Sequence, residues 1–150
     1  MITYRQGNLL ESGLDAIAHG CNCEGIMNAG IARDLKNKFP QMYREYNSLC
    51  SAHLAKPGEY HIYSSQNSPH IINLFTQKTI EEGAKIEYIE DSLALLASKL
   101  PELKNKDVDI KSLGMPRLGC GLGRLNWSQV RPVIERNLGN LDIEVIVYSL

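Results

Sequence analysis

The sequence predicts an α/β fold of three layers, in which a mixed, mostly parallel sheet lies between two layers of helices. Short apolar runs alternate with helical patterns along the chain. The last apolar run, Ile143–Tyr148, is continuous and rich in valine and isoleucine, as is typical of a parallel strand that is buried on both faces. A length of 150 residues suits one domain, so we expect residues 1–150 to form a single domain.

The expected strands are short runs of apolar and β-branched residues that are bounded by turn residues. They are Ile2–Arg5, Ala16–His19, Glu59–Ser64, His70–Thr76, Ile110–Met115 and Ile143–Tyr148. The third and fourth are separated by residues 66–69, which have turn composition. We therefore expect these two strands to form a hairpin.

The expected helices are segments in which apolar side chains recur at steps of three and four residues. They are Ile31–Phe39, Gln41–Ser51, Ile86–Leu100 and Trp127–Leu138. Pro40 separates the first two, and Pro101 is expected to end the third. Asn126 is expected to cap the start of the fourth helix, and Gly139 to end it. The polar segment Thr79–Lys85 predicts an exposed loop.

Composition and cysteine spacing exclude several classes of protein. A net charge of −1 argues against a general nucleic-acid binder, which carries a basic excess. No apolar run approaches the ~20 residues that cross a bilayer, and no apolar leader begins the chain, so we expect a cytoplasmic monomer with no membrane partner. The cysteines lack the spacing of a zinc site, so we expect free thiols, no metal and no cofactor. They are Cys21, Cys23, Cys50 and Cys120.

The first loop that could carry chemistry, residues 19–32, leaves a buried strand and ends where a helix begins. Ala29 and Gly30 keep side chains out of the way, so a ligand can approach the backbone closely. The first N–H groups of the next helix have no intrahelical acceptor and form a seat for a phosphate. Asn22 can both donate and accept hydrogen bonds, which suits a ribose diol.

The second loop, residues 116–126, again joins a buried strand to a helix. Gly119, Gly121 and Gly123 alternate along it, so successive N–H groups can converge on an anion, although the same pattern also serves as a tight turn. Neither loop is a Walker A or a dinucleotide fingerprint. Because ligands of such sheets bind at the carboxyl ends of the strands, the two loops predict a pyrophosphate held between them.

Four segments resemble one known family, the macrodomains, and the resemblance covers nearly the whole chain. They are Gln6–Leu10, residues 22–32 with the ending Ala-Gly-Ile-Ala, Met115–Trp127, and Val147–Leu150. Met115–Trp127 resembles the terminal ADP-ribose glycohydrolases and the DNA ADP-ribosyl glycohydrolases of toxin–antitoxin pairs. Residues 19–23 and 74–76 resemble the ADP-ribose-1″-phosphate phosphatases. The resemblance implies the three-layer fold and a site for ADP-ribose.

The resemblance also implies which residues surround the ligand. Asn8 and Leu9 would contact the adenine, and Leu150 would lie near the adenosine end. Asn22 would meet the distal ribose. Residues 29–32 would hold one phosphate, and residues 119–124 the other phosphate and the edge of the distal ribose. The residues expected to line the site are Asn8, Leu9, Gly20, Cys21, Asn22, Met27, Asn28, Ala29, Gly30, Ile31, Ala32, Thr76, Gln77, Arg117, Leu118, Gly119, Cys120, Gly121, Leu122, Gly123, Arg124 and Leu150.

The sequence departs from the glycohydrolase pattern at two positions. That branch uses a lysine after the strand that ends near Thr76, where this chain has Gln77 followed by Lys78, and either of the two could occupy the lysine position. It also uses an aspartate where this chain has Gly123. A glutamine cannot form a Schiff base, and a glycine cannot act as a base.

The expected catalytic residues are His19 and Asn22. An imidazole titrates near pH 6.5 and can exchange a proton with water or phosphate, although His19 could instead only bond neighbouring backbone. The favoured hypothesis is a phosphatase that binds ADP-ribose and acts on ADP-ribose-1″-phosphate. The alternatives are an ADP-ribosyl-ester glycohydrolase whose partners are ADP-ribosylated proteins or nucleic acids, and a reader of ADP-ribose without catalysis.

Overall fold

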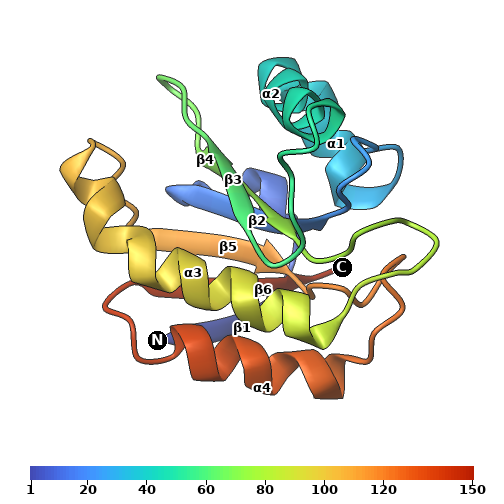
Figure 1. Cartoon of the computed structure of the whole chain (residues 1–150). Coiled ribbons are helices and arrows are strands. Elements are labelled where there is room, and N and C mark those ends of the chain that lie inside the picture. Colours follow the sequence, from blue (N-terminus) through green and yellow to red (C-terminus); the bar gives the residue numbers. More distant parts are fainter.

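The computed structural model describes residues 1–150 and confirms the three-layer α/β architecture (Figure 1). The strands are β1 (Ile2–Gln6), β2 (Ala16–Cys21), β3 (Tyr60–Tyr63), β4 (His70–Phe75), β5 (Ser112–Pro116) and β6 (Glu144–Ser149). The α-helices are α1 (Gly30–Lys38), α2 (Pro40–Ser51), α3 (Ile86–Asn105) and α4 (Trp127–Leu138). A short 3-10 helix, η1 (Leu9–Glu11), follows β1.

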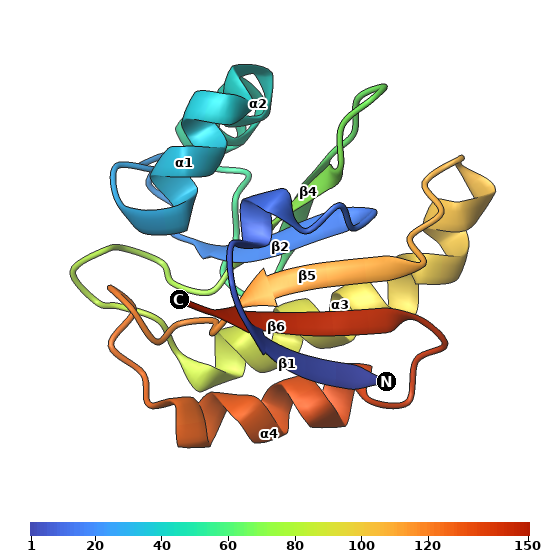
Figure 2. The same cartoon turned by 180° about the vertical axis from the view of Figure 1, so that it is seen from behind.

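The strands form one sheet in the order β1-β6-β5-β2-β4-β3. Every neighbouring pair is parallel except β3 and β4, which form the antiparallel hairpin that the sequence predicts. Helices α1 and α2 cover one face of the sheet, and α3 and α4 cover the other (Figures 1 and 2). The carboxyl ends of all the parallel strands therefore lie at one edge, which we call the carboxyl edge.

The sheet separates two hydrophobic cores. A cluster of 17 buried residues fills the space between the sheet and helices α3 and α4. A smaller cluster of 11 fills the space under α1 and α2. Strand β2 supplies both, because Ala16 and Ala18 belong to the first cluster and Ile17 and Cys21 to the second. By the same alternation, His19 lies on the α2 side of the sheet.

Strands β2 and β5 are paired over a short length only. They pair at Ala16↔Leu113 and Ile17↔Gly114, whereas β2 pairs with β4 from Ala16 to Cys21. Chain connections lead from β5 to β6 on one side and from β2 to β4 on the other, so the direction of winding changes between β2 and β5. In parallel sheets, a ligand crevice lies at this point, outside the carboxyl ends of the strands.

Three local features differ from expectation. Helix α3 does not end at Pro101 but continues to Asn105, because Leu103 goes on packing against the larger core and offsets the hydrogen bond that proline cannot make. Asn126 is the N-cap of α4, but its side chain makes no capping hydrogen bond. Helix η1 was not expected, and the Asn8 side chain caps it by accepting from the N–H of Leu10 at 3.0 Å.

Two predictions concern the whole chain. All four cysteines are free thiols, as expected. None of the helices combines the length with the apolar composition that crossing a bilayer requires.

Candidate functional site

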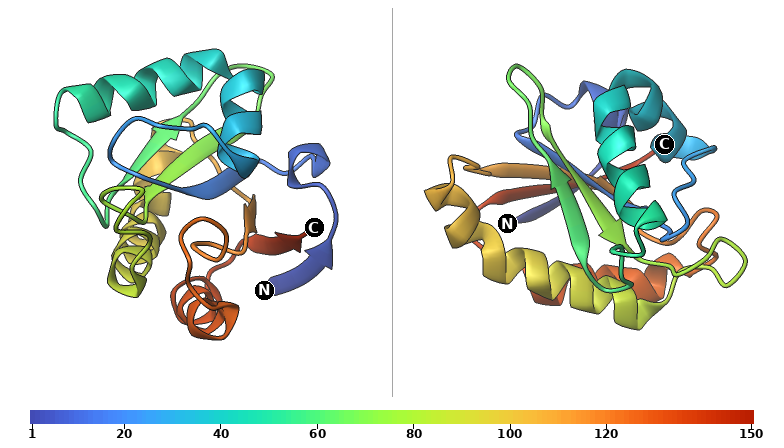
Figure 3. Two further views of the ribbon diagram at one scale, coloured as in Figure 1. Left: turned by 90° about the vertical axis from the view of Figure 1, so that its right-hand side faces the viewer. Right: turned by 45° about the horizontal axis from the view of Figure 1, so that its top comes forward.

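Three loops meet at the carboxyl edge. We call them the β2 loop (residues 22–29), the β4 loop (residues 76–85) and the β5 loop (residues 117–126). The β4 loop lies between the other two: the N–H of Cys23 donates to Lys78 O at 3.1 Å, and the N–H of Ala84 donates to Gly123 O at 3.2 Å. The left view of Figure 3 faces this edge. The sequence-predicted loops are therefore brought together through a third segment.

The β2 loop is held in shape by polar side chains of α2. The Tyr46 hydroxyl lies 2.8 Å from Asn22 O and 2.9 Å from Asn22 Oδ1, within donating reach of both. The Tyr43 hydroxyl and the Asn47 amide both donate to Gly25 O, at 2.7 and 3.2 Å. These three side chains lie on one face of α2 at steps of three and four residues. Their role was missed because the sequence places Tyr46 on the apolar face of this helix and does not show that Tyr43 and Asn47 face a distant loop.

Asn22 lies at the start of the β2 loop, and most of the hydrogen-bonding groups of its side chain already have partners within the protein. Its Oδ1 accepts from the N–H groups of Glu24 and Ile26, at 3.0 and 3.3 Å, in addition to Tyr46. Its Nδ2 donates to Ile26 O at 2.9 Å. An amide nitrogen carries two N–H groups, so one remains free. Asn22 is buried, with 4% of its surface exposed, and its oxygen is already saturated, so this one N–H is all that its side chain could offer a ligand.

Helix α1 begins with open backbone N–H groups. The N-cap, Ala29, makes no side-chain cap, and the first turn contains no acidic residue. The first helical hydrogen bond is from the N–H of Arg33 to Ala29 O, so the N–H groups of residues 30–32 have no acceptor. Gly30 is exposed with φ +58°, and a Cβ there would meet no atom within 4 Å. Three donors at the positive end of a helix form a seat for an anion.

The β5 loop offers a second run of open donors. The N–H groups of residues 121–123 have no acceptor, although Arg124 N–H bonds Gly121 O at 3.0 Å and Leu125 N–H bonds Gly119 O at 2.8 Å. Gly119 and Arg124 both have positive φ, +72° and +68°. The Arg124 side chain donates to Glu81 O of the β4 loop. The loop is thus a closed turn with its outermost N–H groups unpaired.

Position 123 is closed to any side chain in this loop conformation. A Cβ on Gly123 would lie 2.7 Å from Gly119 O, 2.9 Å from Gly119 Cα and 2.8 Å from Ala84 Cβ. In contrast, a Cβ on Gly121 would meet nothing within 4 Å. The position where the glycohydrolase resemblance implies an aspartate is therefore filled by the chain itself.

Gln77 and Lys78 follow β4 and contact the β2 loop through their backbones. Gln77 N–H donates to Cys21 O at 3.4 Å, and Lys78 O accepts from Cys23. Gln77 is half-buried, and its Oε1 is buried without a partner. Lys78 is exposed. Burial raises the pKa of the Cys23 thiol to about 11, and the positive charge of the Lys78 ammonium partly counteracts this rise. A cationic amine thus lies at the rim beside the β2 loop.

The environment of His19 argues against the catalytic role that the sequence suggested for it. Its imidazole is fully buried on the α2 side of the sheet, and Nε2–H donates to Asn73 Oδ1 at 2.6 Å. Burial lowers the pKa of His19 to about 4, so the ring is neutral at pH 7. A buried, neutral ring with these partners does not reach a ligand at the loops. Asn73, which the sequence analysis did not single out, is its fixed partner.

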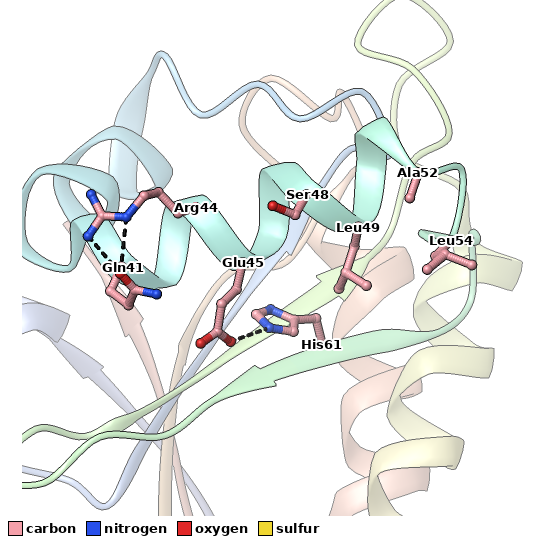
Figure 4. A pocket seen from close by; sticks show the side chains of 8 residues that line it. All are labelled: Gln41, Arg44, Glu45, Ser48, Leu49, Ala52, Leu54 and His61. Carbon is pink, nitrogen blue, oxygen red and sulfur yellow. Dashed lines mark hydrogen bonds and ion pairs between the residues drawn. The ribbon is translucent and has the colours of Figure 1, made fainter.

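A chain of hydrogen bonds continues from this pair to the surface. Asn73 Nδ2 donates to His61 Nδ1 at 3.0 Å, and His61 Nε2 donates to Glu45 Oε1 at 3.0 Å. Figure 4 shows the outer end of the chain, where Glu45 and His61 meet across α2 and β3. We call His19, Asn73, His61 and Glu45 the buried polar chain; Glu45, its outer end, is exposed.

Several side chains expected at the ligand are in the cores instead. Leu9, Cys21 and Met27 belong to the smaller core, and Leu118 belongs to the larger one. Thr76 is buried beside Gly20. These residues can offer only backbone groups. The predicted residues that are exposed are Asn8, Asn28, Ala29, Gly30, Arg117, Gly121, Leu122, Arg124 and Leu150, and those partly exposed are Gly20, Ile31, Ala32, Gln77, Gly119, Cys120 and Gly123.

Two of the pockets in the surface lie away from the carboxyl edge. One, of about 600 Å³, lies between α2 and β3 and is lined by Gln41, Arg44, Glu45, Ser48, Leu49, Ala52, Leu54 and His61 (Figure 4). The other, of about 400 Å³, lies at the amino ends of β2 and β4, near Asp15 and His70. Neither contains a predicted site residue, so we place the candidate site at the loops.

The sequence has relatives of known activity. A family model described as "Macro domain" matches residues 18–134. The chain is 31% identical to a DNA ADP-ribosyl glycohydrolase of Thermus aquaticus, covering 99% of this chain and 41% of the relative. It is 34% identical to human ADP-ribose glycohydrolase OARD1, covering 99% and 91%. It is 25% identical to an ADP-ribose 1″-phosphate phosphatase of Meyerozyma guilliermondii, covering 97% and 98%.

The fold also has solved counterparts. The macrodomain of Mycobacterium tuberculosis DarG matches it with a TM-score of 0.90 at 31% identity, covering 100% of this chain and 98% of that one. The chain spans about two-fifths of the length of the DNA ADP-ribosyl glycohydrolases that it matches.

The burial of His19 predicts a loss of stability in mild acid. An unfolded histidine titrates near pH 6.5, but the folded chain protonates His19 only near pH 4, so between these values the unfolded state binds the extra proton. Stability therefore falls as pH drops through this window, by about 2 kcal/mol between pH 7 and pH 5. His19→Gln, which can still donate to Asn73, should flatten this dependence in urea denaturation at the two pH values. His53→Gln, at an exposed histidine, is the control. Parallel losses in wild type and His19→Gln would contradict the assignment.

The closure of position 123 predicts a contrast between two glycines of one loop. Gly123→Ala forces a Cβ against the backbone of Gly119 and should destabilise the fold by about 1–3 kcal/mol. Gly121→Ala has open space and should change stability by less than about 0.5 kcal/mol. Chemical denaturation of the two variants measures both. Equal stability would mean that the loop opens without cost.

Proposed function

Because this chain belongs to the macrodomain family, we propose that it binds ADP-ribose at the carboxyl edge and hydrolyses a derivative of ADP-ribose. The observation that carries the proposal is the pair of backbone runs at residues 30–32 and 121–123, whose N–H groups have no acceptor in the chain. Each run suits one anionic phosphate, and ADP-ribose carries two phosphates joined as a pyrophosphate.

Once the two phosphates are placed, the positions of the distal ribose and of the adenosine on either side of them can be inferred. The distal ribose would lie at Asn22, whose free N–H can donate to a hydroxyl. The adenosine would lie beside Asn8 and Leu150, which are exposed after the neighbouring strands β1 and β6. Leu9 would take part through its backbone, because its side chain is in the smaller core.

The proposed substrate is ADP-ribose-1″-phosphate. Water adds to phosphorus, the bond from phosphorus to the 1″ oxygen breaks, and the products are ADP-ribose and inorganic phosphate. This reaction requires neither a lysine nucleophile nor an acid at position 123. The absence of space at Gly123 and the neutral amide of Gln77 support this choice over the lysine-dependent cleavage. Asn22 would orient the phosphorylated ribose, and His19 would take no part.

A second candidate is the cleavage of an ADP-ribosyl ester on a protein or nucleic acid. Lys78 favours it, because its side chain is exposed while its carbonyl is bonded to the β2 loop. The names of the Thermus and human relatives favour it as well. A reader without turnover is the remaining alternative, and all three share the same binding site.

Binding is tested by a substitution at the start of α1. Gly30→Glu places a carboxylate beside the open N–H groups and should abolish ADP-ribose binding in titration calorimetry, because it fills the seat and repels phosphate. Gly30→Ala is the matched control: it has the same φ strain but open space for its methyl, so it should melt like Gly30→Glu and still bind ADP-ribose. Normal binding by Gly30→Glu would place the phosphate elsewhere.

Catalysis is tested with two substrates and three variants. The wild type should release phosphate from ADP-ribose-1″-phosphate, Asn22→Ala should slow release about tenfold or more, and Lys78→Ala should leave it unchanged. Lys85→Ala, another exposed lysine of the β4 loop, is the control. Removal of ADP-ribose from glutamate or DNA that depends on Lys78 but not on Lys85 would establish the glycohydrolase instead. ADP-ribose binding with no turnover of either substrate would establish the reader.

A further inference from the structure

We propose that Tyr46 is a positioning residue that orients the Asn22 amide toward the distal ribose and so favours ligands that carry this ribose. The inference rests on the proposed function, because it assigns Asn22 to the distal ribose. Tyr46 touches no ligand in this scheme. It acts from the core side of the β2 loop, through the side chain of Asn22.

The first step is that Tyr46 is itself immobile. Its side chain has no exposed surface, and its ring is stacked on Phe75 of β4 with centroids 6.3 Å apart and planes 19° apart. Burial raises the pKa of the phenol, so the hydroxyl keeps its proton and remains a donor. A fixed donor of this kind can hold its acceptor in one orientation.

The second step is that the Tyr46 hydroxyl contacts the side-chain amide of Asn22, the group that would donate to the ribose. The N–H groups of Glu24 and Ile26 hold Oδ1, and so does the Tyr46 hydroxyl, whose one proton is shared between Oδ1 and the main-chain Asn22 O; together they fix the plane of the amide. Because Nδ2 uses one N–H for Ile26 O, the remaining N–H can have only one direction. Loss of the hydroxyl removes the only one of these donors that lies outside the loop, and the amide is then free to turn with the loop.

The third step separates Tyr46 from its neighbour on α2. Tyr43 also donates a hydroxyl to the β2 loop, but only to the main chain at Gly25. Tyr43 therefore supports the loop without contacting the Asn22 side chain. Tyr43→Phe is accordingly a matched control, since it removes the same group from the same helix and affects the same loop.

The experiment compares ADP-ribose with ADP, which lacks the distal ribose, by titration calorimetry. Tyr46→Phe keeps the packed ring and removes only the hydroxyl, so it should weaken ADP-ribose about tenfold and leave ADP unchanged. Tyr43→Phe should leave the ratio of the two affinities as in wild type. A loss of the same size for both ligands in Tyr46→Phe would show a purely structural role and overturn the proposal, as would no loss for either.

A double-mutant cycle gives a second, independent reading. In an Asn22→Ala background, Tyr46→Phe should change the affinity ratio no further, because the group that it positions is gone. A further change would mean that Tyr46 acts by another route, and would overturn the proposal. If the wild type binds neither ligand, the proposed function fails, and this inference fails with it; if the wild type binds both and only the ratio is insensitive to Tyr46, this inference alone fails.

Discussion

The short pairing between β2 and β5 is the constraint on which the rest of the site depends. Neighbouring strands that stay paired lie about 4.8 Å apart, which is too close for a pyrophosphate to pass between the loops that follow them. Here the pairing ends at Ile17 and Gly114, and the β2 and β5 loops leave the sheet separately. The β4 loop forms backbone hydrogen bonds with both, which helps to place the two runs of open N–H groups.

Backbone groups and side chains have different roles in the proposed site. Anion binding is assigned to main-chain N–H groups at α1 and in the β5 loop, where glycine keeps the approach open. Side chains act mainly from behind: Tyr43, Tyr46 and Asn47 hold the β2 loop, and Arg124 ties the β5 loop to the β4 loop. A site built in this way has few exposed charged groups to identify it.

The sequence predicted the elements and the two loops because both depend on local patterns. Apolar periodicity located the strands and helices, and glycine spacing located the loops. Contacts between distant segments could not be predicted in the same way: Tyr46 meets Asn22 from 24 positions away, and Gly119 and Ala84 close position 123 only once the loops have folded. The burial of His19 could have been predicted from the sequence, because His19 alternates with Ile17 and Cys21, whose apolar side chains indicate a buried face of β2.

The buried polar chain has an evolutionary consequence. Its donors all run one way, from His19 to Asn73, then His61, then Glu45, so each member has a partner on the next element. Replacing one inner member alone leaves a buried donor or acceptor unsatisfied, which costs about 1–3 kcal/mol. We therefore expect positions 19, 61 and 73 to change as a unit: relatives should either keep all three polar or exchange them together for apolar residues.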